Sequence, residues 1–168
     1  MKLFRFFADF EGRIPRSTYW LASVAVFVID VIVAAIAAAT AEVLAGETAG
    51  YVTMHIVTIA FFYPQFVIAL KRAHDLNMSN RTIYAWYTAL IVDYAVIRLT
   101  LWVWSNYEQN LYSLVALAFV LMFIIAVGAV TIVMLIELGF RRGTRGPNRY
   151  GPDPLAKTRL RGADGAGT

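Results

Sequence analysis

Four long apolar segments, separated by short polar ones, dominate the sequence. They cover about residues 19–39, 50–70, 82–104 and 111–140. A helix needs about 20 mostly apolar residues to cross a bilayer core of about 30 Å. The segments do not show the alternating pattern of a membrane β-barrel strand. They therefore predict an all-α membrane protein with four transmembrane helices.

The composition supports this interpretation and limits the chemistry. Hydrophobic residues make up 60% of the 168 residues and charged residues 15%, and the mean hydropathy is +0.62. A soluble domain of this size could not bury so much apolar surface. The chain has no cysteine and two histidines, which excludes thiol catalysis and leaves little for a zinc site. We expect no catalytic residues, no metal and no cofactor.

The basic residues predict the orientation of the four spans. Fourteen of the 15 Lys and Arg residues lie before the first span, between the second and third, or after the fourth. The two opposite loops contain Glu42, Glu47 and Glu108 and no cation. Because cytoplasmic loops retain Lys and Arg, both termini are expected in the cytoplasm and the protein in the bacterial inner membrane. A cleaved signal peptide over residues 1–39 is the weaker interpretation, since its apolar run is too long.

The two ends of the chain carry separate predictions. Residues 3–10 predict a short N-terminal helix in the membrane interface, and an ordinary packed N-terminus is the alternative. Residues 1–154 are expected to form a single transmembrane domain, and residues 155–168 a disordered basic tail. Small polar residues are expected to cap two of the long helices at their N-termini: Ser17 or Thr18 for the first, and Ser79 or Asn80 for the third.

Four ionisable residues fall inside the predicted spans: Asp30, His55, Asp93 and Arg98. At about 1.5 Å per helical residue, both aspartates lie about 16 Å from the cytoplasmic ends of their spans, near the bilayer midplane. They could form a polar layer that shares a proton or a cation. The favoured interpretation is structural, with each group satisfied by neighbouring helices.

Three polar segments on the predicted cytoplasmic side share arginine, histidine, aspartate and turn residues. Their candidate site residues are Arg13, Arg16, Arg72, His74, Asp75, Ser79, Asn148, Arg149, Tyr150 and Asp153. Together the segments resemble the YhaH-like bacterial inner-membrane family, domain of unknown function family 805. The matching residues are Gly12, Arg13 and Arg16; Arg72, His74, Asp75 and Ser79; and Asn148, Tyr150, Gly151, Pro152, Asp153 and Pro154. The resemblance implies a four-span membrane protein and no settled activity.

Two uses of these polar residues are open. The favoured one is a satisfied ionic network in which Arg13, Arg16, Arg72, His74 and Arg149 pair with Asp75 and Asp153. The other is a pocket in which arginines clasp a lipid phosphate, for which the guanidinium group is suited.

The sequence as a whole favours a non-enzymatic membrane protein whose basic cytoplasmic face binds anionic lipid headgroups or a protein partner. A homo-oligomer is compatible with so thin a bundle. Nucleic acid is not expected as a partner, because orientation in the membrane explains the basic charge. The alternative function is a small transporter or channel subunit that uses Asp30, Asp93 and Arg98.

Overall fold

Four long helices make up most of the chain. The computed structural model describes residues 6–106 and 111–156. Its helices are α2 (Arg16–Ala45), α3 (Glu47–Asp75), α4 (Asn80–Asn106) and α5 (Leu111–Phe140). All four are long and apolar enough to cross a membrane. Residues 6–106 and 111–156 contain no β-strand beyond one isolated bridge, so the predicted all-α class with four span-forming helices is confirmed.

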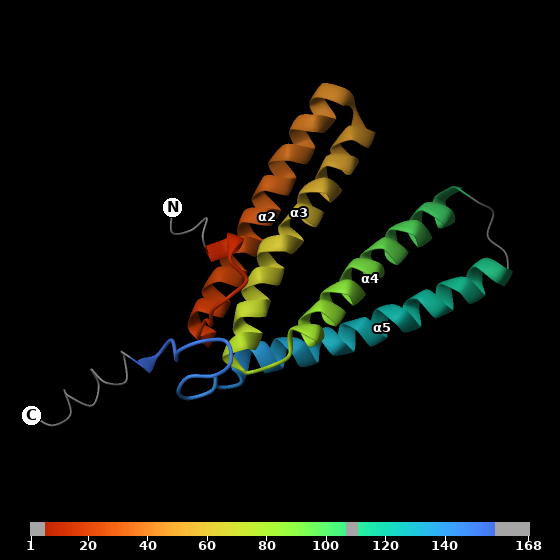
Figure 1. The fold of residues 1–168 in the computed structure, drawn as a ribbon. Helices are drawn as coiled ribbons and strands as arrows, with labels where there is room; N and C mark the ends of the chain where they lie inside the picture. Colours follow the sequence, from red (N-terminus) through yellow and green to blue (C-terminus); the bar gives the residue numbers. More distant parts are fainter. Residues whose placement is uncertain (1–5, 107–110, 157–168) are drawn as a thin grey trace, which may run out of the picture.

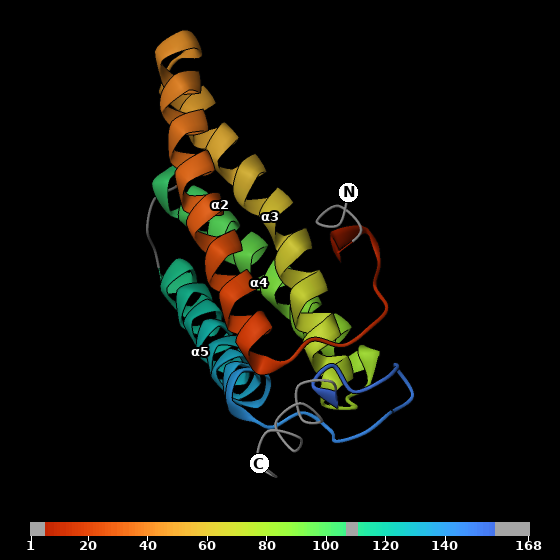
Figure 2. The same cartoon turned by 90° about the vertical axis from the view of Figure 1, so that its left-hand side faces the viewer.

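The helices form two antiparallel hairpins that meet at one end of the molecule. Helices α2 and α3 make one hairpin and α4 and α5 the other (Figure 1). The start of α2, the end of α3, the start of α4 and the end of α5 lie together at one end, and the hairpins diverge toward the other. The segment that follows α5 folds back across the meeting point (Figures 1 and 2). We call this meeting point the junction end.

The packed core is concentrated at the junction end. Nine consecutive residues of α3, numbers 67–75, are buried, whereas Gly50 is the only buried residue in the rest of the helix. Hydrophobic residues from the other three helices surround this part of α3, and they include Tyr19, Ile83 and Leu138. The diverging halves of the helices instead expose large aliphatic side chains, as expected of surfaces that face lipid.

Small residues let helices approach closely at two places. A Cβ atom added to Gly50 of α3 would lie 2.9 Å from the Ala38 carbonyl oxygen of α2. At the junction end, Gly139 of α5 leaves room for the Trp20 indole, whose Nε1 donates a hydrogen bond to the Gly139 carbonyl at 3.1 Å. Each glycine therefore fixes one interhelical contact.

The predicted cap of α2 is wrong, and that of α4 is confirmed. Helix α2 has Pro15 at its N-cap and no side-chain cap. The Tyr19 amide donates to the Pro15 carbonyl at 3.0 Å, so the helix has already begun before Ser17 and Thr18. At α4, the Ser79 hydroxyl accepts a hydrogen bond from the Arg81 amide at 3.3 Å, which is the geometry of an N-cap.

The N-terminal segment runs against α3. Residues 6–8 are helical, and Phe6 and Phe7 pack against the core. The Lys71 ammonium donates to the Phe6 carbonyl at 2.7 Å and lies 4.5 Å from the Phe6 ring centroid. Residues 1–5, which include Leu3 of the predicted interfacial face, lie outside the described residues, as do residues 157–168 of the predicted tail. Interfacial placement therefore stays a prediction.

Candidate functional site

The three polar segments converge on the carboxylate of Asp75, at the last residue of α3. Arg13 donates to its Oδ1 through Nε at 3.1 Å and through Nη2 at 3.0 Å. The same guanidinium donates to the carbonyl oxygens of Thr144 at 2.6 Å, Gly146 at 2.8 Å and Gly151 at 3.2 Å. One arginine thereby joins the N-terminal segment to both α3 and the segment after α5.

Arg72 bonds the other oxygen of the Asp75 carboxylate. Its Nη1 donates to Asp75 Oδ2, its Nη2 to the Arg141 carbonyl, and its Nε to the Leu138 carbonyl at 2.7 Å. Leu138 lies in the last turn of α5 and Arg141 directly follows the helix, and the last carbonyl groups of a helix lack intrahelical partners. A buried cation there also suits the negative end of the helix dipole. Arg72 thus ties the end of α5 to α3.

The three charged side chains are almost fully removed from solvent. The side chains of Arg13 and Arg72 are each 1% exposed and that of Asp75 is 5% exposed. Two guanidinium groups share one carboxylate, and backbone carbonyls accept most of their remaining N–H groups. We call Arg13, Arg72, Asp75 and the residues that bond them the polar junction.

Backbone and hydroxyl groups of the segment after α5 complete the polar junction. The Thr144 amide and hydroxyl both donate to the Asp75 carbonyl, at 2.8 Å and 2.9 Å. The Asn148 amide donates to the His74 carbonyl at 2.9 Å and to the Thr144 hydroxyl at 2.9 Å. The end of α3 is therefore capped by groups that lie about 70 residues away in sequence.

His74 and Tyr150 form a stacked pair beside the polar junction. Their rings lie 3.9 Å apart at 9°, and the Tyr150 hydroxyl donates to the Met78 carbonyl at 2.7 Å. The imidazole lies within hydrogen-bond distance of the Gly12 carbonyl, at 3.1 Å, and of Asn80 Oδ1, at 2.8 Å. This pair holds the turn between α3 and α4 against the segment after α5.

The backbone of Gly143 lies directly against the Asp75 carboxylate. A Cβ atom added there would lie 1.9 Å from Asp75 Oδ2. Only a residue without a side chain fits this position, because no rotation of an added methyl group moves its Cβ. The glycine lets the segment after α5 pass over the ion pairs.

The remaining predicted site residues lie outside this cluster. Ser79 caps α4, and Arg149 is exposed, donating to the Asn77 carbonyl at 3.2 Å and lying over the Tyr150 ring. Asp153 accepts hydrogen bonds from the amides of Gly146 and Leu155, at 3.1 Å and 2.9 Å. These three residues order turns around the polar junction.

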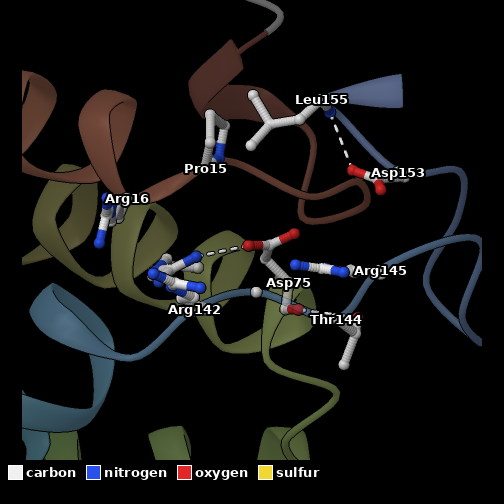
Figure 3. Close-up of a pocket in the computed structure, with 10 residues that line it drawn as sticks. Pro15, Arg16, Asp75, Arg142, Thr144, Arg145, Asp153 and Leu155 are labelled. Atoms are coloured by element: carbon white, nitrogen blue, oxygen red, sulfur yellow. Dashed lines mark hydrogen bonds and ion pairs between the residues drawn. The ribbon is translucent and has the colours of Figure 1, made fainter. Parts of the chain in front are cut away.

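Arg16 lines a separate cavity of about 250 Å³ next to the polar junction. Arg142, Arg145 and Pro15 also line it, and Arg72 and Asp75 form part of its wall. Figure 3 shows Arg16 and Arg142 on one side of Asp75 and Arg145 on the other. All three of these arginines are exposed, and no ion pair with the described residues engages them. We call this space the arginine cavity.

The four ionisable residues of the predicted spans do not line one common cavity. His55 and Arg98 lie together between α3 and α4, where His55 contacts the Tyr94 hydroxyl and Arg98 donates to the Tyr51 hydroxyl. Asp30 lines a different cavity. The buried Oδ1 atoms of Asp30 and Asp93 have no hydrogen-bond partner among the described residues. No hydrogen bond joins Asp30 to Asp93 through these atoms, and Asp93 does not line the cavity of Asp30, so a proton or cation shared between them stays a prediction.

Several residues of the site were not among the sequence candidates. Thr144, Gly143, Arg142 and Arg145 all lie in the run that follows α5, of which only later residues were predicted site residues. The available signal was the alternation of arginine with glycine in this run, because glycine next to a buried charge allows the backbone to approach it. Across residues 6–106 and 111–156, no group of three or more potential metal ligands occurs.

The comparisons with known proteins identify one family. A family model described as a protein of unknown function (DUF805) matches residues 7–152. The match includes every residue of the polar junction and the three arginines of the arginine cavity. No curated protein and no solved structure matches the chain.

Proposed function

Because the chain belongs to the DUF805 family of proteins of unknown function, we propose its role from its own geometry: it is a non-enzymatic protein of the bacterial inner membrane that binds anionic lipid headgroups. The binding site is the arginine cavity. The polar junction is the structural framework that holds this cavity together.

The distribution of charge supports the placement of the cavity on the cytoplasmic face. Both loops at the far ends of the hairpins lack Lys and Arg, and the segments at the junction end are rich in them. Because Lys and Arg remain on the cytoplasmic side, the junction end is the cytoplasmic one. The inner leaflet there carries anionic lipid, and each nearby Lys or Arg contributes about 1 kcal/mol to binding it.

The depth of the cavity supports a headgroup ligand. Arg16 is the first residue of α2, and Arg142 follows the end of α5 by two residues. One helical turn above Arg16, the Trp20 ring packs 5.7 Å from the Phe140 ring, measured between centroids. Indole groups prefer the level of the lipid headgroups, so the arginines beside this pair lie where lipid phosphates are found.

The arginines at the junction end form two groups, one buried and one exposed, and this difference is the main support for the proposal. The guanidinium groups of Arg13 and Arg72 are buried and bonded, so they are unavailable to a ligand. Arg16, Arg142 and Arg145 are exposed around a cavity whose wall contains four arginines and two aspartates. Both oxygens of Asp75 are already bonded by Arg13 and Arg72. The net positive charge and the forked donors suit a phosphate group.

Lipid retention in native mass spectrometry tests the proposal. The cavity variant replaces Arg16, Arg142 and Arg145 with glutamine. A matched control variant removes the same charge from the same face by replacing Arg81, Arg141 and Arg149 with glutamine. We expect the cavity variant to retain phosphatidylglycerol at least tenfold less well than the control, since both variants lose the same charge near the anionic leaflet but only the cavity variant loses the forked donors around one phosphate.

Two results would contradict headgroup binding at this cavity. Equal losses in both variants would show that only the total charge matters. Unchanged retention in the cavity variant would show that these arginines bind no lipid phosphate.

A further inference from the structure

A second cavity of about 380 Å³ lies between the two hairpins, inside the predicted spans. All four helices line it, with α2 and α3 contributing most of the residues and α5 contributing Leu135. It lies on the side of Trp20 that faces away from the arginine cavity, toward the diverging ends of the helices. We call it the helix-lined cavity.

The wall of the helix-lined cavity is aromatic and carries one acid. Seven of its 14 lining residues are aromatic, against 14% of the chain, and they include Phe27, Phe61, Phe62 and Trp86. Its lining contains no Lys or Arg, and Asp30 is its only charged residue. Aromatic faces carry negative electrostatic potential, and a cation within about 6 Å of a ring centroid is attracted to it.

Asp30 brings an unsatisfied carboxylate oxygen to this wall. The Oδ1 atom is buried and has no hydrogen-bond partner among the described residues. Asp30 is fourteen residues from the start of α2, or about 21 Å along a helix of about 45 Å, and so lies near its middle. An acid at this depth is costly unless it is paired. The side-chain amide of Gln65 in the same wall donates instead to the Ser23 carbonyl, at 2.9 Å.

We propose that the helix-lined cavity binds a lipophilic organic cation, with Asp30 as the counter-charge and the aromatic rings as the walls. The acid supplies charge complementarity, and the rings supply both apolar contact and cation–π attraction. A small inorganic cation is disfavoured, because the wall offers too few oxygen ligands to replace a hydration shell. This site differs from the arginine cavity in place and in the sign of its ligand.

Binding of tetraphenylphosphonium tests the assignment, with tetraphenylborate as an anion of the same shape. The full chain is placed in nanodiscs of zwitterionic lipid, which leaves the arginine cavity without anionic lipid. Isothermal titration then measures binding above that of empty nanodiscs. We expect saturable binding of one cation per chain and no saturable binding of the anion.

Two variants locate the site. Asp30→Asn is expected to weaken cation binding about tenfold or more, because it removes a charged partner. Asp93→Asn is the matched control, since Asp93 has the same kind of unpartnered oxygen and does not line the cavity. It is expected to leave binding unchanged. Phe27→Leu replaces an exposed ring of the cavity wall and leaves Asp30 in place. It is expected to weaken cation binding severalfold.

Several outcomes would overturn the proposal. Equal binding of the two ions, or unchanged cation affinity in Asp30→Asn, would show that the acid does not select the ligand. An equal loss in Asp93→Asn would show a general effect of removing intramembrane charge. If Asp30→Asn fails to fold, unchanged affinity in Phe27→Leu overturns it instead.

Discussion

At the scale of single residues, Asp75 links the N-terminal segment, α3 and the segment after α5 through two arginines. It accepts from Arg13 of the N-terminal segment and from Arg72 one turn earlier in its own helix. Both arginines then bond backbone carbonyls of the segment at and after the end of α5. A buried ion pair adds little net stability over apolar packing, yet removing one partner leaves an uncompensated charge.

Replacing Asp75 with asparagine is therefore expected to destabilise the protein by about 3–5 kcal/mol, because two buried cations lose their counter-charge. The midpoint of thermal denaturation in detergent measures this loss. The control is Glu137→Gln, which breaks the exposed ion pair with Arg141 and should cost less than about 1 kcal/mol. Equal midpoints for the two variants would contradict the central role of Asp75.

Gly143→Ala tests whether the backbone after α5 passes directly over the Asp75 carboxylate. The added methyl group would overlap Asp75 Oδ2, so either the segment after α5 or the ion pairs must shift. We expect a clear fall in the denaturation midpoint, comparable to that of Asp75→Asn. A variant as stable as the wild-type protein would show that the segment does not pass over the carboxylate as described.

At the scale of helices, α2 and α3 lie side by side along their hairpin (Figure 1). The far end of the α2–α3 hairpin is held where Gly50 meets the backbone of Ala38. Ala38, opposite Gly50, is itself a small residue that permits this approach. Gly50 could not be selected from the sequence, because a single glycine in an apolar segment carries no periodic signal.

Gly50→Ala is expected to lower the denaturation midpoint by forcing α2 and α3 apart, since the new Cβ would lie 2.9 Å from both the Ala38 oxygen and Glu42 Cβ. Gly128→Ala in α5 is the matched control, because nothing lies within 4 Å of its added Cβ. Alanine is the better helix former by about 1 kcal/mol, so the control should be at least as stable as the wild-type protein. A lower midpoint for the control than for Gly50→Ala would contradict this packing.

The extent of the helices could be predicted from the sequence, but the grouping of the arginines could not. Apolar length and hydropathy are properties of a segment alone, and each predicted span lies within a helix. Arg13 and Arg16 are three residues apart and looked like members of one cluster. Pro15 starts α2 between them, which places Arg13 in the polar junction and Arg16 on the wall of the arginine cavity. Such a separation depends on tertiary contacts 130 residues away.

At the scale of the whole molecule, the polar junction joins two hairpins that otherwise diverge. It contains the ends of α3 and α5 and the segment before α2, so it resists separation of the hairpins. The arginine cavity lies beside it, and the helix-lined cavity lies between the hairpins. In our proposal the first faces the cytoplasmic lipid headgroups and the second opens within the bilayer.

The proposed role of the arginine cavity depends most on the side of the membrane at which the polar junction lies. The chain has no cysteine, so single cysteines can be introduced without removing others. We choose Thr48→Cys in the first turn of α3, at the far end of its hairpin, and Ala156→Cys beyond the polar junction, both at exposed positions. A membrane-impermeant maleimide applied to intact spheroplasts should label Thr48→Cys at once and Ala156→Cys only after the membrane is opened. Labelling of Ala156→Cys from outside would contradict the account.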